Sequence, residues 1–181
     1  MEQGVMIPNV PRPASQLRLA GLDEESIVDG PGLRFVVFTQ GCRNNCKGCQ
    51  NPQTHSYLGG TVYEVEDLLS RYAQNPLLSG MTFSGGEPFD QALALGALAD
   101  GVHSLGGDVV CYTGYTCEHI LDLIRDEGPD SPRAALLDKA DILIDGPYVE
   151  ALRDLDLLFR GSSNQRILDR KARAEIAAKR R

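Results

Sequence analysis

Several features that assign proteins to broad classes are missing from this sequence. No apolar run approaches the roughly 20 residues needed to cross a bilayer, so we expect no membrane association. Residues 1–16 lack the basic segment and apolar stretch of a secretory signal peptide. We therefore expect a cytoplasmic protein in a reducing environment, where disulfides are rare. No repeat of fixed period is present, and 181 residues suit a single domain.

Basic residues are also in the minority. The 18 Lys and Arg are outnumbered by 25 Asp and Glu, which gives a net charge of −7. Such a chain has no global attraction to nucleic acid, so no nucleic-acid partner is expected. The bases nevertheless crowd the C-terminus, as Arg166, Arg170, Lys171, Arg173, Lys179, Arg180 and Arg181. This pattern is typical of a solvated, fraying helix, and it also fits a docking arm for an acidic partner surface.

Strand and helix patterns alternate along the chain. Apolar stretches predict strands at 17–22, 33–39, 80–84, 108–113 and 141–145. Helical spacing predicts helices at 65–75, 90–105, 116–127 and 131–139. This alternation implies a parallel sheet with helical crossovers. A full eight-fold barrel takes about 250 residues, so we expect an α/β fold with a partial, open (β/α) barrel and a mostly parallel sheet.

Caps and breakers set the expected boundaries. The proline-containing segment 1–15 is predicted to be an irregular lead-in, 16–168 a single domain and 169–181 a basic C-terminal tail. Residues 61–64 (Thr-Val-Tyr-Glu) match a capping box for the first helix, and Asp90 is a candidate cap for the second. Ser162 or Ser163 is a candidate cap for a helix over 164–178.

Three cysteines dominate the functional argument. Cys42, Cys46 and Cys49 have the spacing C-x3-C-x2-C and directly follow an apolar stretch. Thiolates this close in sequence can converge on one metal centre without long-range folding. Iron–sulfur clusters are usually held by four cysteines, so three leave one iron open for another ligand. Three thiolates with His55 also match a Cys3His zinc site, although the second C-x2-C pair of the usual zinc pattern is missing.

The other two cysteines, Cys111 and Cys117, fall within a predicted buried strand and on the apolar face of a predicted helix. Free cysteine packs well in protein cores. We expect both residues to be structural rather than ligands.

Further motifs accompany the cysteines in a fixed order. They are Gly30-Pro31-Gly32-Leu33-Arg34, Ser84-Gly85-Gly86-Glu87-Pro88, Tyr112-Thr113-Gly114-Tyr115, Asp145-Gly146-Pro147-Tyr148 and Arg160-Gly161-Ser162-Ser163-Asn164-Gln165. With the cysteines, this set resembles the radical S-adenosylmethionine (SAM) superfamily and, within it, the glycyl-radical-enzyme activases. The last two motifs are similar in particular to activases of anaerobic ribonucleoside-triphosphate reductases. The resemblance extends from Ser26 to Leu168.

The resemblance implies a function and its cofactors. It implies a [4Fe–4S] cluster and SAM, whose reductive cleavage yields a radical that makes a glycyl radical on a large partner enzyme. The expected partner is an anaerobic ribonucleoside-triphosphate reductase, and the expected electron donor is a flavodoxin or a ferredoxin. Two alternatives stay open: a radical SAM enzyme acting on a small molecule, such as a deazaguanine-type synthase, and a zinc-binding interaction module.

The resemblance also implies roles for individual residues, which follow predicted strands and therefore meet at one rim of the sheet. Cys42, Cys46 and Cys49 would ligate three irons. Gly85 and Gly86 would let SAM approach the backbone closely, and Glu87 would orient its ammonium group or brace the turn. Thr113 and Asp145 would help to hold SAM or a cation. Gly48 and Gln50 would flank the adenine, although Gln50 replaces the aromatic residue or His that is common there.

Overall fold

The computed structural model describes residues 13–180, which form one seven-stranded sheet with five helices. The strands are β1 (Gln16–Ser26), β2 (Arg34–Thr39), β3 (Thr61–Glu64), β4 (Gly80–Gly85), β5 (Asp108–Tyr112), β6 (Ile142–Asp145) and β7 (Arg166–Asp169). The helices are α1 (Val65–Tyr72), α2 (Ala92–Ser104), α3 (Cys117–Glu127), α4 (Pro132–Lys139) and α5 (Arg170–Ala178). Short 3-10 turns lie at Pro52–Thr54, Pro88–Gln91 and Glu150–Leu152.

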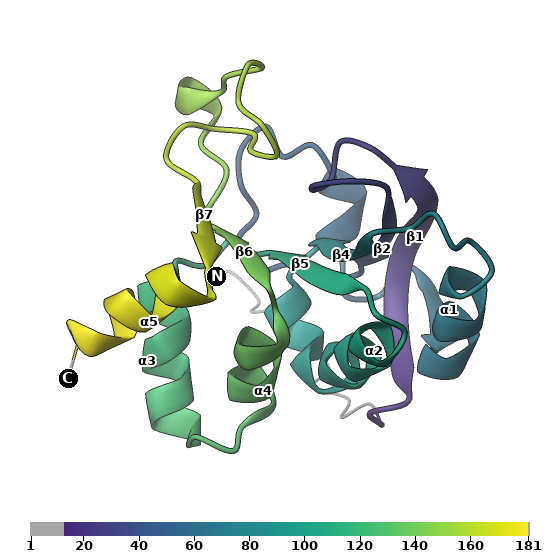
Figure 1. Cartoon of the computed structure of the whole chain (residues 1–181). Coiled ribbons are helices and arrows are strands. Elements are labelled where there is room, and N and C mark those ends of the chain that lie inside the picture. Colours follow the sequence, from purple (N-terminus) through teal and green to yellow (C-terminus); the bar gives the residue numbers. More distant parts are fainter. Residues whose placement is uncertain (1–12, 181) are drawn as a thin grey trace.

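The sheet is open and mixed, with the order β3-β1-β2-β4-β5-β6-β7. The four central strands, β2, β4, β5 and β6, run parallel. The pairs β1–β2, β1–β3 and β6–β7 are antiparallel. The predicted α/β fold with a parallel core is thus confirmed, and the antiparallel flanks are an addition to it. In Figure 1 the helices lie in the lower half, while long loops rise above the strands.

The two faces of the sheet have different environments. Helices α1 to α4 supply buried residues to one hydrophobic cluster, which includes Phe35, Val37, Phe83 and Leu143 from the strands, and α5 packs against it. Side chains alternate along a strand, so Val36, Val110 and Tyr112 belong to the other face. Val36 and Val110 are fully buried but lie outside that cluster. The second face is therefore covered by loops rather than by the helical layer.

The β1–β2 loop covers this second face and is held by Arg34. The Arg34 side chain is fully buried and donates to Thr82 Oγ1 at 3.1 Å, to Met81 O at 2.7 Å and to Pro31 O at 3.4 Å. It also pairs with Asp108. Thr82 in turn donates to Asp29 O at 2.8 Å. The Gly-Pro-Gly-Leu-Arg motif is thus a clamp that folds the loop back onto the sheet.

Three capping predictions are wrong. Residues 61–64 form β3, because pairing with β1 satisfies their backbone, and the helix that follows has no side-chain cap bond at Glu64. Asp90 lies inside the 3-10 turn and bonds Tyr57, whereas α2 begins after Gln91. Ser162 and Ser163 do not start a helix: β7 intervenes, and Asp169 caps α5 by accepting from Ala172 N at 2.7 Å.

Thr116 and Ser131 cap α3 and α4, since they accept from His119 N at 3.2 Å and Ala134 N at 3.3 Å.

The basic tail is only partly solvated. Arg173 of α5 is buried and donates to Ala140 O at 2.5 Å. Ala172 and Ile176 pack against the core cluster. The picture of a fraying helix is therefore wrong for this face of α5. Most of the predicted lead-in, 1–15, lies outside the described residues. Within residues 13–180, no helix combines the length and the apolar character needed to cross a membrane.

Candidate functional site

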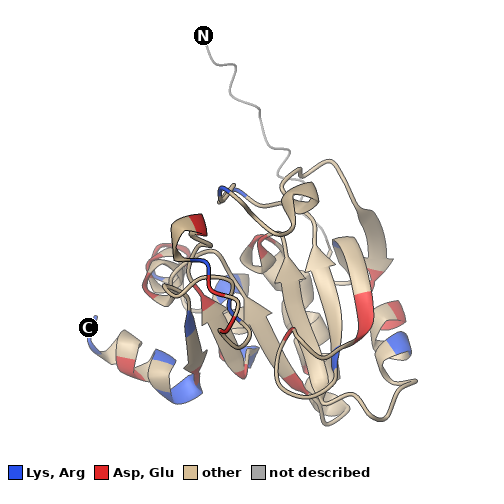
Figure 2. Ribbon diagram, turned by 90° about the horizontal axis from the view of Figure 1, so that it is seen from above, with Lys and Arg blue, Asp and Glu red and all other residues tan. Residues whose placement is uncertain are grey.

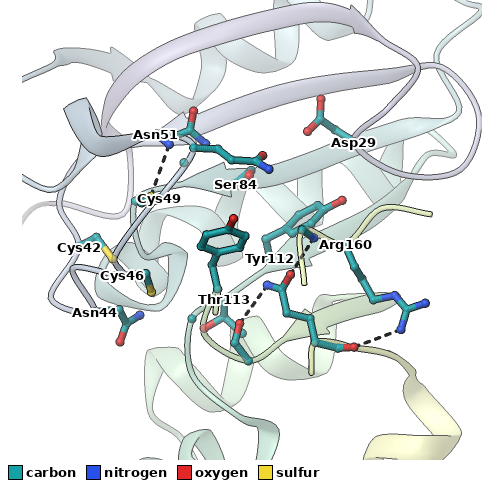
Figure 3. Close-up of a pocket in the computed structure, with 18 of the residues that line it drawn as sticks. Asp29, Cys42, Asn44, Cys46, Cys49, Asn51, Ser84, Tyr112, Thr113 and Arg160 are labelled. Carbon is teal, nitrogen blue, oxygen red and sulfur yellow. Dashed lines mark hydrogen bonds between the residues drawn. The ribbon is translucent and has the colours of Figure 1, made fainter. Parts of the chain in front are cut away.

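A cleft of about 340 Å³ opens where the strand ends meet the second face of the sheet. Its walls come from the β1–β2 loop, the cysteine loop (residues 41–51), the ends of β4, β5 and β6, and the segment 157–165. Figure 3 shows Cys42, Cys46 and Cys49 on one side and Asp29 and Arg160 on the other. The predicted convergence of the strand-end loops on one rim is confirmed.

Short-range hydrogen bonds fold the cysteine loop. Gly41 N donates to Thr54 O at 2.7 Å, and Cys42 N donates to His55 O at 3.2 Å, so the 3-10 turn at Pro52–Thr54 closes the loop onto its own start. Cys49 N donates to Cys46 O at 3.2 Å. All three cysteines are free, half-buried and part of the cleft wall. Their arrangement follows from local sequence, as their spacing predicted.

The Cys42 thiol resists ionisation. Burial raises the pKa of the Cys42 thiol to about 11, and the charge of Glu87 adds to this effect. A cysteine binds a metal as the thiolate, and a bound metal deprotonates the thiol that coordinates it. Three free thiols on one wall, with open volume beside them, fit a cluster held by three cysteines. Within residues 13–180, no three His, Cys, Asp or Glu side chains are grouped to hold a single metal ion, although His55 lines the same cleft.

The two glycines after β4 fit against the chain's own backbone. A Cβ on Gly86 would overlap the Gly41 carbonyl oxygen, and one on Gly85 would overlap the backbone of Phe38. Gly85 also has a φ of +91°. Both glycines line the cleft as predicted. However, the space that a side chain would fill belongs to β2 and the cysteine loop, so the glycines set the position of Cys42 rather than simply admitting a ligand.

Glu87 is fully buried and braces this turn. Its carboxylate accepts four hydrogen bonds, from Thr113 Oγ1 at 2.8 Å, Phe89 N at 3.1 Å, Gly114 N at 3.0 Å and Asn44 Nδ2 at 3.1 Å. Burial raises the pKa of Glu87 to about 7, and the hydrogen bonds oppose that rise. Of the two predicted roles for Glu87, these contacts support bracing the turn. The residue stands behind the cleft wall, not in it.

Asp145 is likewise engaged within the protein. Its buried carboxylate accepts from Cys117 N at 2.7 Å, at the start of α3, and from Arg166 Nε at 3.0 Å. Arg166 also pairs with Glu118 at 2.6 Å, and this bond lowers the pKa of Glu118 to about 2. The neighbouring Gly146, rather than Asp145, lines the cleft. These contacts give no support to the predicted role of Asp145 in holding SAM or a cation.

The remaining predicted residues differ in where they lie. Gln50 and Thr113 line the cleft, but Thr113 Oγ1 is engaged by Glu87 and by Tyr115 N at 3.1 Å. Gly48 has a φ of +72° and packs against the Glu150 side chain, outside the cleft wall. Of the adenine-flanking pair, only Gln50 therefore faces the open volume.

The far wall of the cleft was not assigned from the sequence. It includes Tyr112, Tyr148, Arg160 and Gln165. The Gln165 side chain accepts from Gly161 N at 2.9 Å and donates to Gly146 O at 3.0 Å, so it ties the segment 157–165 to the end of β6. All four residues lie inside motifs that the sequence singled out. The motif Arg160–Gln165 thus has a structural role, because it forms part of this wall.

Comparison with known proteins agrees with the site. The family described as a 4Fe-4S single cluster domain matches residues 28–168. An anaerobic ribonucleoside-triphosphate reductase-activating protein of Vibrio cholerae serotype O1 is 33% identical over 77% of this chain and 89% of its own length. Proteins of the same name from Salmonella typhimurium and Enterobacteria phage T4 are 31% and 30% identical over 77% of this chain, and over 90% and 86% of their own lengths. The chain belongs to the 4Fe-4S single cluster domain family, together with these reductase-activating proteins.

Proposed function

We propose that this protein activates an anaerobic ribonucleoside-triphosphate reductase by generating a glycyl radical on it, with a [4Fe–4S] cluster and SAM as cofactors. One observation carries the proposal: three free cysteines on a single loop line a cleft next to the two-glycine turn, in a chain whose relatives carry that activator's name. The proposal includes a cytoplasmic location, a flavodoxin or ferredoxin as electron donor and a radical SAM domain over 16–168.

The cluster and SAM supply the redox chemistry. When bound, they would provide one-electron reductive cleavage of the carbon–sulfur bond of SAM and, through it, removal of a hydrogen atom from a glycine Cα of the partner. The protein's contribution is to bind and orient these groups and to exclude competing reactions. Cys42, Cys46 and Cys49 would hold three irons and leave the fourth open for SAM.

The cleft itself is suited to a nucleoside-sized ligand. Its volume of about 340 Å³ lies at the lower end of the range of small-molecule sites. Gln50 of the cysteine loop and Tyr112 of β5 present polar and aromatic groups to this volume. The backbone of Gly85 and Gly86 forms part of the wall beside Cys42 and is held there by the Glu87 brace. These groups would position SAM between the cluster and the far wall.

The open architecture favours a protein substrate. The helices pack on one face of the sheet, while the cleft lies on the other, and the sheet ends at β3 and β7 without closing on itself. This arrangement supports a partial barrel of the radical SAM type. A partner enzyme could complete the wall that the chain does not supply, whereas an enzyme for a small metabolite must enclose its substrate alone.

An anaerobic reconstitution tests this function. Reduced protein is mixed with SAM and an anaerobic ribonucleotide reductase, and electron paramagnetic resonance is recorded. We expect a glycyl-radical doublet on the reductase with the wild type, and none with Cys46→Ala. A reductase that acquires the doublet from its own activase but never from this protein would reject the proposal.

A further inference from the structure

Exposed apolar side chains gather where the cleft opens. In the described part of the chain, six large apolar residues are at least 70% exposed, and four of them are Ile27, Val28, Leu155 and Leu158. We call these four the apolar rim. Scattered apolar residues are normal on a surface, but a concentration beside a functional cleft marks an interaction site.

Two loops carry the apolar rim, and both contribute to the cleft. Val28 itself lines the cleft from the β1–β2 loop. Leu155 and Leu158 flank Leu157, which with Phe159 lines the cleft from the other loop. Because both loops reach the same cleft, the rim residues lie at its entrance rather than on unrelated surfaces.

The first loop holds its rim residues in a fixed conformation. Ser26 Oγ donates to the Asp29 carboxylate at 2.5 Å and accepts from Val28 N at 3.3 Å. The Asp29 carbonyl is bound by Thr82, and Arg34 clamps the following turn. Ile27 and Val28 are therefore exposed on a structured loop, not on a loose end.

The second loop is pinned at its base. Ser163 N donates to Leu152 O at 2.9 Å, and Val149 N donates to the buried Ser162 Oγ at 3.2 Å. Near its tip, Phe159 has a φ of +59°, a conformation uncommon for an aromatic residue and found preferentially at functional positions. The loop that carries Leu155 and Leu158 is therefore held in a defined conformation by the hydrogen bonds at its base.

The second loop carries no net charge. Residues 153–160 contain two basic and two acidic side chains, so this segment is electrically neutral. In the view from above, basic and acidic segments are scattered over the ribbon rather than separated onto two sides (Figure 2). A partner would therefore be held at the second loop by apolar contact more than by opposite charge.

We propose that the apolar rim is the docking surface for the glycine-bearing loop of the partner reductase. This inference rests on the function proposed above. A glycine Cα in a folded protein can enter the cleft only if the chain on either side of it passes over the entrance. Glycine offers no side chain for recognition, so its neighbours must supply the affinity, and the rim offers them apolar surface on both loops.

The test compares rim variants with an exposed leucine elsewhere. Leu155→Ser/Leu158→Ser and Ile27→Ser alter the rim, and Leu105→Ser, at the end of α2 and 52% exposed, is the matched control. Each reconstituted protein is assayed for glycyl radical formation against reductase concentration, for SAM cleavage without reductase and for iron content. We expect the rim variants to raise the apparent KM for the reductase about tenfold, while partner-independent SAM cleavage and iron content match the control.

The outcomes separate the two proposals. If the wild type makes no glycyl radical on the reductase, the proposed function fails. If the wild type does so and the rim variants behave like Leu105→Ser, the docking surface fails while the function stands. A wild-type dimer that Leu155→Ser/Leu158→Ser converts to a monomer, with the KM unchanged, would assign the rim to self-association instead. Because the two variants change different loops, a folding defect in one leaves the other to decide.

Discussion

Asn44 Nδ2 lies 3.1 Å from Glu87 Oε2, and this bond ties the cysteine loop to the turn that follows β4. The same carboxylate holds Thr113 and Gly114 at the end of β5. Three segments that line the cleft therefore share one buried anchor. A substitution that displaces any one of these segments should therefore displace the other two as well.

The cysteines divide into two classes that mutation can separate. Cys42→Ala, Cys46→Ala or Cys49→Ala should abolish a stable cluster, because each of these thiols lines the cleft. Cys111→Ala and Cys117→Ala should keep it, since both side chains are fully buried in the hydrophobic core. The measurement is iron and sulfide per chain after anaerobic reconstitution. Equal losses in all five variants would reject the assignment.

Gly86→Ala should disturb the cluster as well as ligand binding. An added Cβ would overlap the Gly41 carbonyl, so the cysteine loop must shift. We expect the free energy of unfolding to fall by about 2 kcal/mol and the iron content to drop. The matched control is Gly21→Ala, because nothing lies within 4 Å of a Cβ at that position. Full iron content in Gly86→Ala with weakened SAM binding would show that this side faces the ligand instead.

Glu87 should make stability depend on pH. Its pKa is about 7 in the folded protein and near 4.5 when unfolded, so the folded state binds more protons between these values. The free energy of unfolding should therefore fall by roughly 1 kcal/mol per pH unit as the pH rises through this window. Urea unfolding of wild type and Glu87→Gln under anaerobic, reducing conditions checks this. Identical slopes in the two proteins would show that Glu87 does not titrate there.

Arg34→Lys should loosen the β1–β2 loop although it keeps the charge. Lysine cannot reproduce the planar fork that reaches Thr82, Met81 and Pro31 together. We expect a loss of about 2 kcal/mol in the free energy of unfolding and faster amide hydrogen exchange at residues 27–33. Lys139→Arg, at a half-exposed ion pair with Asp100, serves as the control for a basic exchange. If amide hydrogen exchange at residues 27–33 is the same in Arg34→Lys and in the wild type, Arg34 does not hold this loop.

Local sequence patterns were sufficient to predict part of this fold. The cysteine spacing and the apolar stretches that precede the strand-end loops are local signals, and they predicted the cysteine loop and the parallel core. Residues 61–64 show where such signals fail. Their β-branched and aromatic residues suit a strand as well as a capping box, and only pairing with β1 decides between the two.

The candidate site shows the same division. Glu87 and Asp145 were correctly placed near strand ends, but the sequence did not reveal that their carboxylates are used by Asn44 and Arg166, which lie 43 and 21 residues away. The role of Gln165 in the cleft wall could not be predicted from the sequence, because it too depends on contacts between distant residues. Its motif was visible, but its purpose depends on contacts with Gly146 and Gly161 that exist only in the folded chain.

The fate of one hydrogen atom distinguishes a glycyl-radical activase from an enzyme that acts on a small molecule. The partner reductase is prepared with its target glycine deuterated at Cα and is mixed anaerobically with reduced protein and SAM. We expect deuterium in 5′-deoxyadenosine, with a glycyl radical on the reductase in matching amount. If 5′-deoxyadenosine carries no deuterium and instead takes its hydrogen from a small metabolite, the protein is not a glycyl-radical activase.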